Sequence, residues 1–174
     1  GFLWFVVPLC GGGGVEERLR SVGGRYAIAM VDVDHFKKFN DTHGHDVGDQ
    51  VLRLVAARLA EVGGGGRAFR YGGEEFTVLF PDAGVKDTLP YLEHIRQSIE
   101  DYRMAMRGGD RPRSEKQGSK QRGARGQRES ALSVTVSIGV AGPDKRQRTS
   151  AEVIKAADEA LYRAKQGGRN RVSR

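Results

Sequence analysis

The segment Arg67-Ala-Phe-Arg-Tyr-Gly-Gly-Glu-Glu-Phe-Thr-Val-Leu-Phe80 is the most informative part of the chain for its architecture. Its two halves, Arg67–Tyr71 and Glu74–Phe80, have the aromatic and β-branched residues that favour strands. Only Gly72 and Gly73 separate these halves, which is the spacing of a tight β-hairpin. Because a two-residue hairpin turn needs positive φ at both positions, left-handed backbone is predicted at both glycines.

Strands and helices alternate on both sides of this hairpin. The apolar run Tyr26–Asp34 ends in carboxylates, as expected of a buried strand that reaches a functional site, and Leu132–Val140 alternates like a half-buried strand. Helices are predicted over Asp34–Thr42, Asp46–Val62, Thr88–Met106, and from the capping box Thr149–Glu152 to Lys165, with Gly167 ending the last one. This order predicts an α/β fold with a mixed central β-sheet flanked by helices.

Length and composition indicate one globular domain. With 174 residues, 38% of them hydrophobic and 29% charged, the chain is predicted to fold as a single domain over 1–174. Its one cysteine, Cys10, excludes an internal disulfide framework and favours the reducing cytoplasm. The longest apolar run, Phe2–Cys10, is shorter than the ~20 residues that span a bilayer. We interpret it as a buried helix or strand in preference to the end of a membrane segment.

The positive charge of the chain is concentrated in residues 107–128. Eight of the 29 basic residues lie there, with two of the 22 acidic ones, so the remainder carries 21 basic and 20 acidic residues. The segment has five glycines, no aromatic residue and only Ala124 from the apolar set, so it cannot bury much surface. It could bind nucleic acid or anionic lipid, but without aromatic residues for base stacking we favour a basic, flexible, solvated insertion.

Acidic side chains are expected to meet where the first strand adjoins the hairpin. Side chains alternate along a strand, so Asp32 and Asp34 project from the same face, although Asp34 has the alternative role of capping the next helix. If the hairpin is the neighbouring strand, Asp32 converges with Glu74 or Glu75. Oxygen ligands without a Cys or His set favour Mg²⁺, which usually completes its shell with substrate phosphates. The pattern therefore indicates phosphoryl or nucleotidyl transfer.

Four motifs of the chain resemble those of diguanylate cyclase catalytic domains, the GGDEF family. Arg70-Tyr-Gly-Gly-Glu-Glu-Phe76 is similar to the GG(D/E)EF motif, in its GGEEF variant. The segment Asp32–Asp49, DVDHFKKFNDTHGHDVGD, resembles the family's metal and guanine segment. Val136–Val140 and Ala157–Arg171 resemble its last strand and last helix, and the motifs occur in family order along 26–172. The resemblance implies a ferredoxin-like or nucleotidyl-cyclase-like βααββαβ core.

The resemblance also implies a metal site and a catalytic group. Asp32, the carbonyl of Val33 and Glu74 would bind Mg²⁺, with two ions per active site and Mn²⁺ as a substitute. Glu74, with Glu75 nearby, would be catalytic, because a carboxylate there can assist deprotonation of a hydroxyl nucleophile.

For the substrate, GTP, the resemblance implies contacts to the base and to the phosphates. Asn40 and Asp49 would read the guanine edge, since a carboxylate accepts from its N1–H and amine and an amide both donates and accepts. His45 would hold the nucleotide or have only a structural role. The phosphates would contact the backbone amides of His35, Phe36 and Lys37, the glycines Gly72 and Gly73, and the charges of Lys165 and Arg169.

The implied reaction joins two GTP molecules into cyclic di-GMP and releases two pyrophosphates. The 3′-hydroxyl of one GTP attacks the α-phosphate of the other, and the metal lowers the pKa of that hydroxyl. Because one domain offers one guanine site, the active species would be a homodimer with two domains face to face. A catalytically silent GTP-binding module is the main alternative, and a nucleic-acid-binding protein that uses residues 107–128 is a weaker one.

The chain departs from the family pattern in three places. The usual opening segment, DxLTGLxNR, is absent, so we expect an N-terminally incomplete domain that lacks an upstream sensory or dimerisation module, with an upstream membrane anchor left open. The insertion at 107–128 lengthens a loop that the family keeps shorter. Gly63 and Gly66 stand where many relatives carry an RxxD product-inhibition motif, so no inhibition by cyclic di-GMP through that motif is predicted.

Overall fold

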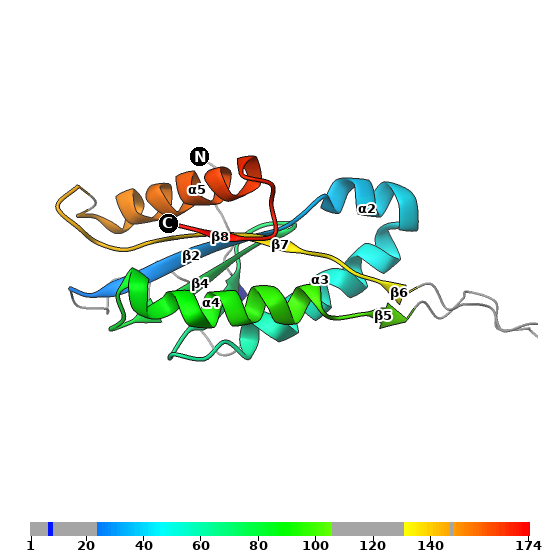
Figure 1. Ribbon diagram of the computed structural model, residues 1–174, viewed down its shortest axis with the longest axis horizontal. Coiled ribbons are helices and arrows are strands. Elements are labelled where there is room, and N and C mark those ends of the chain that lie inside the picture. The colour runs from blue at the N-terminus through cyan, green and yellow to red at the C-terminus, as the bar shows by residue number, and fades with distance from the viewer. Residues whose placement is uncertain (1–6, 9–23, 106–130, 147) are drawn as a thin grey trace, which may run out of the picture.

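The computed structural model describes residues 7–8, 24–105, 131–146 and 148–174 (Figure 1). Their main sheet has six strands in the order β1-β3-β4-β2-β7-β8, and it is mixed because only β7 and β8 are parallel. The strands are β1 (Val7–Pro8), β2 (Tyr26–Val33), β3 (Arg67–Arg70), β4 (Glu75–Pro81), β7 (Val136–Ala141) and β8 (Val172–Ser173). A separate two-stranded ribbon joins β5 (Met104–Ala105) to β6 (Ala131–Leu132).

Helices cover both faces of the sheet (Figure 1). The helix α5 (Ser150–Gln166) lies on one face, α3 (His45–Ala60) and α4 (Val85–Glu100) lie on the other, and α2 (Phe36–His43) extends beyond the end of β2. Apart from the ribbon of β5 and β6 between α4 and β7, the order β2-α2-α3-β3-β4-α4-β7 is the predicted βααββαβ core, and α5 follows it. The predicted fold class is therefore confirmed.

The central strand β2 is buried along its whole length and divides its side chains between two hydrophobic cores. Ala29 and Val31 belong to the core shared with α3 and α4, whereas Ile28 and Met30 pack in the core that includes Leu161 of α5. Because side chains alternate, the next residue on the α5 face is Asp32. The strand thus delivers a carboxylate to the end of an apolar face, as the sequence predicted.

The helix α5 packs directly against β7 at Gly139. A Cβ atom at this position would lie 2.0 Å from the backbone nitrogen of Leu161 and 2.3 Å from the carbonyl oxygen of Ala157. Both are backbone atoms of α5, so the helix would have to move away from the sheet to admit a side chain. Gly139 is therefore required for the close contact between this helix and this strand.

We expect Gly139→Ala to destabilise the fold by about 1–3 kcal/mol, because the whole of α5 must shift to relieve the clash. Thermal unfolding should show a midpoint several degrees lower than that of the unmodified chain. Gly73→Ala is the matched control, since a Cβ at Gly73 meets no atom within 4 Å. Equal midpoints for the two variants would contradict the packing argument.

The predicted hairpin is confirmed, but its predicted turn is wrong. The strands β3 and β4 are antiparallel, with Arg70 opposite Phe76, and neither Gly72 nor Gly73 has positive φ. The amides of Tyr71 and Gly72 both donate to the carbonyl of Glu75, at 2.9 and 3.1 Å. The β3–β4 ladder therefore ends at the pair Arg70–Phe76. The longer connection between these two residues does not need the left-handed backbone of a two-residue turn.

Other boundaries differ from the prediction near β5 and β6. The helix α4 begins three residues before Thr88 and ends at Glu100, so Met104 lies in a strand and not in the expected helix. The strand expected over Leu132–Val140 is interrupted, because Leu132 pairs with Met104 while pairing with β2 begins only at Val136. Apolar alternation continues through the break, which is why the sequence pattern did not reveal it.

Two sequence predictions fall mainly outside the described residues. Of the apolar run Phe2–Cys10, only Val7–Pro8 is described, and it forms the edge strand β1 against β3. The basic insertion at 107–128 lies wholly outside them. Among the helices that the structure describes, none is both long enough and apolar enough to cross a membrane.

Candidate active site

The acidic residues Asp32, Glu74 and Glu75 are neighbours at the end of β2, where the last turn of α5 brings Lys165 to Asp32. In the β2–β4 register Asp32 lies opposite Glu75, and the Val33 amide donates to the Glu74 carbonyl at 3.4 Å. From α5, Lys165 makes an ion pair with Asp32, with 3.0 Å between Nζ and Oδ2. The structure therefore brings together the acidic residues that the sequence singled out and adds a cation to them.

Burial and mutual repulsion disfavour the charged forms of these carboxylates. Burial is the largest cause that raises the pKa of Asp32, and the ion pair with Lys165 and the charge of Arg169 oppose it. Burial also raises the pKa values of Glu74 and Glu75, and the charge of Asp32 raises both further. The site is thus an anionic cluster that one lysine neutralises only in part, and another cation would be stabilised there.

The donor set of this cluster fits a hard divalent cation. Asp32 and Glu74 offer carboxylate oxygens, which Mg²⁺ and Mn²⁺ prefer to nitrogen or sulfur ligands. Across the described parts of the chain, no three Asp, Glu, His or Cys side chains gather as ligands of one ion. Asp32 and Glu74 would therefore share a metal with the Val33 carbonyl and with substrate phosphates, which is how Mg²⁺ is commonly held.

The raised pKa values predict how the pH affects the stability of the metal-free chain. A carboxyl group whose pKa is raised by folding binds more protons in the folded state, so its stabilising contribution is present at low pH and lost as the pH rises through the folded pKa. Glu75→Gln removes one such group. When a chelator keeps the protein free of metal, the thermal unfolding midpoint of the Glu75→Gln variant should exceed that of the unmodified chain. The difference between the two midpoints should grow from about pH 4 to pH 7.

Glu159→Gln, a change at an exposed residue of α5, is the control for this measurement. It alters the same side-chain type outside the cluster, so its midpoint should follow that of the unmodified chain at every pH. A pH-independent difference for Glu75→Gln would show that folding does not raise the pKa of Glu75.

Asp34 does not cap the helix that follows it, so the predicted alternative role is wrong. Its carboxylate accepts hydrogen bonds from the hydroxyls of Thr135 and Ser137, at 2.7 and 2.6 Å, and from the backbone amide of Asn170 at 3.0 Å. The helix α2 has no side-chain cap. The partners that satisfy the buried carboxylate are Thr135 just before β7, Ser137 on β7 and Asn170 after α5, and Asp34 is therefore an anchor within the fold.

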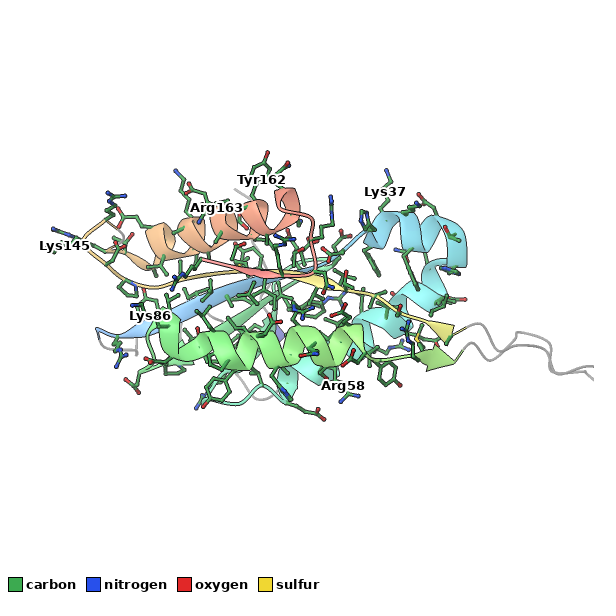
Figure 2. All side chains as sticks on the ribbon, in the orientation of Figure 1. Lys37, Arg58, Lys86, Lys145, Tyr162 and Arg163 are labelled. Atoms are coloured by element: carbon green, nitrogen blue, oxygen red, sulfur yellow. The ribbon has the colours of Figure 1, made fainter. Side chains whose placement is uncertain are left out.

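The start of α2 presents backbone amides beside the cluster. His35 precedes the helix in the left-handed conformation, with φ of 56°, and its carbonyl accepts from the Phe39 amide at 2.9 Å. The first amides of a helix, here including Phe36 and Lys37, lack intrahelical acceptors and carry the positive end of the helix dipole. Figure 2 shows Lys37 projecting from α2 on the side of the sheet that α5 covers. These positions suit an anion such as phosphate.

The residues expected to read guanine lie at the junction of α2 and α3. The Oδ1 atom of Asn40 is buried without a hydrogen-bond partner, the single such side-chain atom among the described residues. A Cβ on Gly48 would lie 1.7 Å from this oxygen, so only glycine leaves room for the amide. An unsatisfied buried acceptor costs about 1–3 kcal/mol, which a ligand that donates a hydrogen bond would recover. His45 begins α3 and is exposed.

A cavity of about 310 Å³ adjoins this junction. Its lining residues are Asp49, Leu52, Arg53, Ala56, Arg70 and Phe76. It combines an apolar wall with the carboxylate of Asp49, which suits a flat polar base.

Sequence reasoning missed the role of Arg70 in this cavity. Its guanidinium folds back and donates to the carbonyls of Gly72 and Gly73, at 3.3 and 2.8 Å. Arg70 thus fixes the glycine loop and lines the base-sized cavity at the same time. Its place beside the glycine pair was visible in the sequence, but nothing there indicated the direction of the side chain.

Comparison with known proteins identifies the family of this chain. The profile of the family described as "Diguanylate cyclase, GGDEF domain" matches residues 15–116 and 111–171. The response regulator PleD of Caulobacter vibrioides is 40% identical over 151 residues, which are 86% of this chain and 29% of PleD. The chain therefore belongs to the diguanylate cyclase GGDEF domain family.

Solved structures extend the comparison to the fold. The GGDEF domain of DgcB from Caulobacter crescentus, crystallised in complex with c-di-GMP, has a TM-score of 0.71 and 34% identity, over 91% of this chain and 81% of that one. The active GGEEF domain of a diguanylate cyclase from Vibrio cholerae has a TM-score of 0.67 and 27% identity, over 90% and 86%. The chain spans between 27% and 39% of the length of the curated relatives considered.

Proposed function

We propose that this chain is the catalytic domain of a diguanylate cyclase, which condenses two GTP molecules into cyclic di-GMP and releases two pyrophosphates. The observation that best supports the proposal is the anionic cluster of Asp32, Glu74 and Glu75 beside Lys165. A base-sized cavity lined by Asp49 and Arg70, and the unpartnered Oδ1 of Asn40 at the junction of α2 and α3, also support it. Such a site accommodates a nucleotide and the metal that nucleotidyl transfer requires.

Different side chains of the site have different roles in the proposed reaction. A divalent ion held by Asp32 and Glu74 would lower the pKa of the attacking 3′-hydroxyl and stabilise charge on the α-phosphate. Glu74 accepts the proton of that hydroxyl, and its raised pKa suits a general base. The new bond joins the 3′-oxygen to the α-phosphorus, and the α–β phosphoanhydride bond breaks. Lys165 leaves its ion pair with Asp32 and contacts the terminal phosphates instead. Together with Arg169 it neutralises the charge of the departing pyrophosphate.

Each product molecule needs two guanine sites, so the proposed active species is a homodimer with its active sites facing each other. We therefore expect specific activity with GTP and Mg²⁺ to rise with protein concentration, and to rise further when a parallel coiled coil is fused to the N-terminus. Mass spectrometry of the products provides the measurement. A rate per protein molecule that is independent of concentration would contradict the face-to-face dimer.

The same experiment separates the enzyme from the silent GTP-binding module. Tight binding of GTP with no cyclic di-GMP from the fused dimer would favour the silent module. Neither binding nor turnover would exclude both functions.

A further inference from the structure

The turn after α5 has a backbone conformation that only its surroundings can maintain. Arg169 and Asn170 are consecutive non-glycine residues in the left-handed region, with φ values of 63° and 45°. This conformation costs roughly 1–2 kcal/mol for each such residue, and it persists where surrounding contacts over-determine it. The turn directly follows the helix that carries Lys165, and the charge of Arg169 reaches Asp32.

The contacts that hold this turn converge on Asn170, whose side chain and amide are all paired. Its backbone amide donates to Oδ2 of Asp34 at 3.0 Å. Its side-chain Nδ2 donates to Oε1 of Glu100 at 2.8 Å, and its Oδ1 accepts from Nη1 of Arg96 at 2.6 Å. Asn170 therefore joins Asp34, which directly follows β2, to two residues of α4.

The α4 side of this connection is itself preorganised. Arg96 has a side chain only 11% exposed, and its Nη1 also donates to Oε2 of Glu100 at 2.7 Å. Its Nε and Nη2 donate to Glu93 at 2.9 and 2.7 Å. A guanidinium that is hydrogen-bonded to two carboxylates has a fixed position, because these hydrogen bonds restrict the rotamers of all three side chains.

The strand side is equally rigid. Asp34 is 6% exposed, and the hydroxyls of Thr135 and Ser137 hold both of its carboxylate oxygens. Asp34 follows β2 directly, two residues after Asp32, so any shift of the turn relative to Asp34 is also a shift relative to the carboxylate cluster.

We propose that Asn170, clamped between Asp34 and the Arg96–Glu100 pair, is a positioning residue that fixes the turn after α5 so that Arg169 and Lys165 face the nucleotide phosphates. This inference rests on the proposed function. It assigns α4, which contributes no residue to the site, a role in binding phosphate. It also predicts that disturbing the clamp weakens contacts to the phosphate chain and leaves the recognition of guanine intact.

Asn170→Gly tests this role directly, because glycine adopts the left-handed conformation without cost and removes only the side chain. If Asn170 serves only the backbone conformation, the glycine variant should bind and react like the unmodified chain. If its side chain positions the turn, GTP should bind about tenfold more weakly, which corresponds to ~1.4 kcal/mol, while GMP affinity changes less than about twofold. KM should rise by the same factor, with a smaller change in kcat.

Arg96→Ala is the second variant, and it removes the hydrogen bond that α4 donates to Asn170 without changing any residue of the turn. It should weaken GTP binding in the same direction, and the double variant should lose less than the sum of the two single effects, because both act through one connection. Arg163→Ala is the control, since Arg163 is an exposed residue of α5 that makes none of the contacts described for Asn170 and Arg96. Thermal unfolding of each variant verifies that it is folded.

Titration of the full chain with GTP, GDP and GMP in the presence of Mg²⁺ distinguishes the outcomes. A loss that grows with the number of phosphates supports the positioning role. Equal losses for GTP and GMP, or unmodified affinities in both Asn170→Gly and Arg96→Ala, overturn it while the proposed function stands. If the unmodified chain binds no GTP, the proposed function fails and this inference fails with it.

Discussion

Glu74→Ala is expected to abolish the formation of cyclic di-GMP while the chain stays folded. The residue is half-buried in the connection before β4, where it adds a carboxylate to the cluster of Asp32 and Glu75. Its removal takes away a proposed metal ligand and the proposed base together, so a loss of at least about 10²–10³ in kcat is expected. Removing a charge that Asp32 and Glu75 repel should leave the unfolding midpoint unchanged or raise it.

The control for this experiment comes from the family motif. Glu74→Asp converts the GGEEF sequence of this chain into GGDEF, keeps a carboxylate at the position, and should retain activity. Product is measured by mass spectrometry on the coiled-coil dimer, so that weak association does not hide turnover. Unmodified turnover by Glu74→Ala would remove this residue from the catalytic site, whereas inactivity of both variants would indicate that the site demands the longer side chain.

The fold was predictable because the apolar residues of the chain recur with the clear periods of strands and helices. The alternation of side chains along β2 predicted that Asp32 lies on the same face as Met30, without knowledge of the neighbouring strands. The capping box at Thr149 and Glu152 predicted the start of α5. The turn at Gly72 and Gly73 was not predictable from spacing. A glycine pair between two apolar runs has the same sequence whether pairing continues to the glycines or stops at Arg70, and only hydrogen bonding across the strands distinguishes these cases.

The site was predictable to the extent that its groups are adjacent in sequence. Glu74 and Glu75 were linked to Asp32 by one assumption, that the hairpin pairs with β2, and the register confirms it. The contacts of Asp34 were hidden, because its partners are between 101 and 136 residues away in the sequence. Local reasoning assigned that carboxylate to the nearest helix start, and a tertiary contact replaced the local one.

The fit of Asn40 against Gly48 was hidden for a different reason. The two residues belong to different helices, and the sequence alone indicates only that Gly48 lowers the stability of the helix that contains it. In the structure it is the position that lets the Asn40 amide lie between α2 and α3. A glycine that costs helical stability is explained here by the space that another side chain needs.

Asp49→Ala is expected to impair the choice of nucleotide more than the chemistry. Asp49 lines the cavity and is the one carboxylate among its described lining residues. Guanine presents donors at N1 and at its amine where adenine presents an acceptor and a donor, so a carboxylate favours guanine and disfavours adenine. Loss of a hydrogen bond to a charged group costs ~1.5–3 kcal/mol, which predicts that the preference for GTP over ATP in kcat/KM falls by about ten- to hundredfold.

Competition between GTP and ATP, followed through the masses of the products, measures this preference. Asp49→Asn keeps the shape and one acceptor oxygen but loses the charge, so its preference should fall between those of the unmodified chain and Asp49→Ala. The contrast with Glu74 is the decisive part. A group that reads the base changes the ratio between two nucleotides, whereas a group that acts on the phosphate lowers both rates together. If Asp49→Ala lowers both rates and still excludes ATP, Asp49 acts on the reaction and another residue reads the guanine.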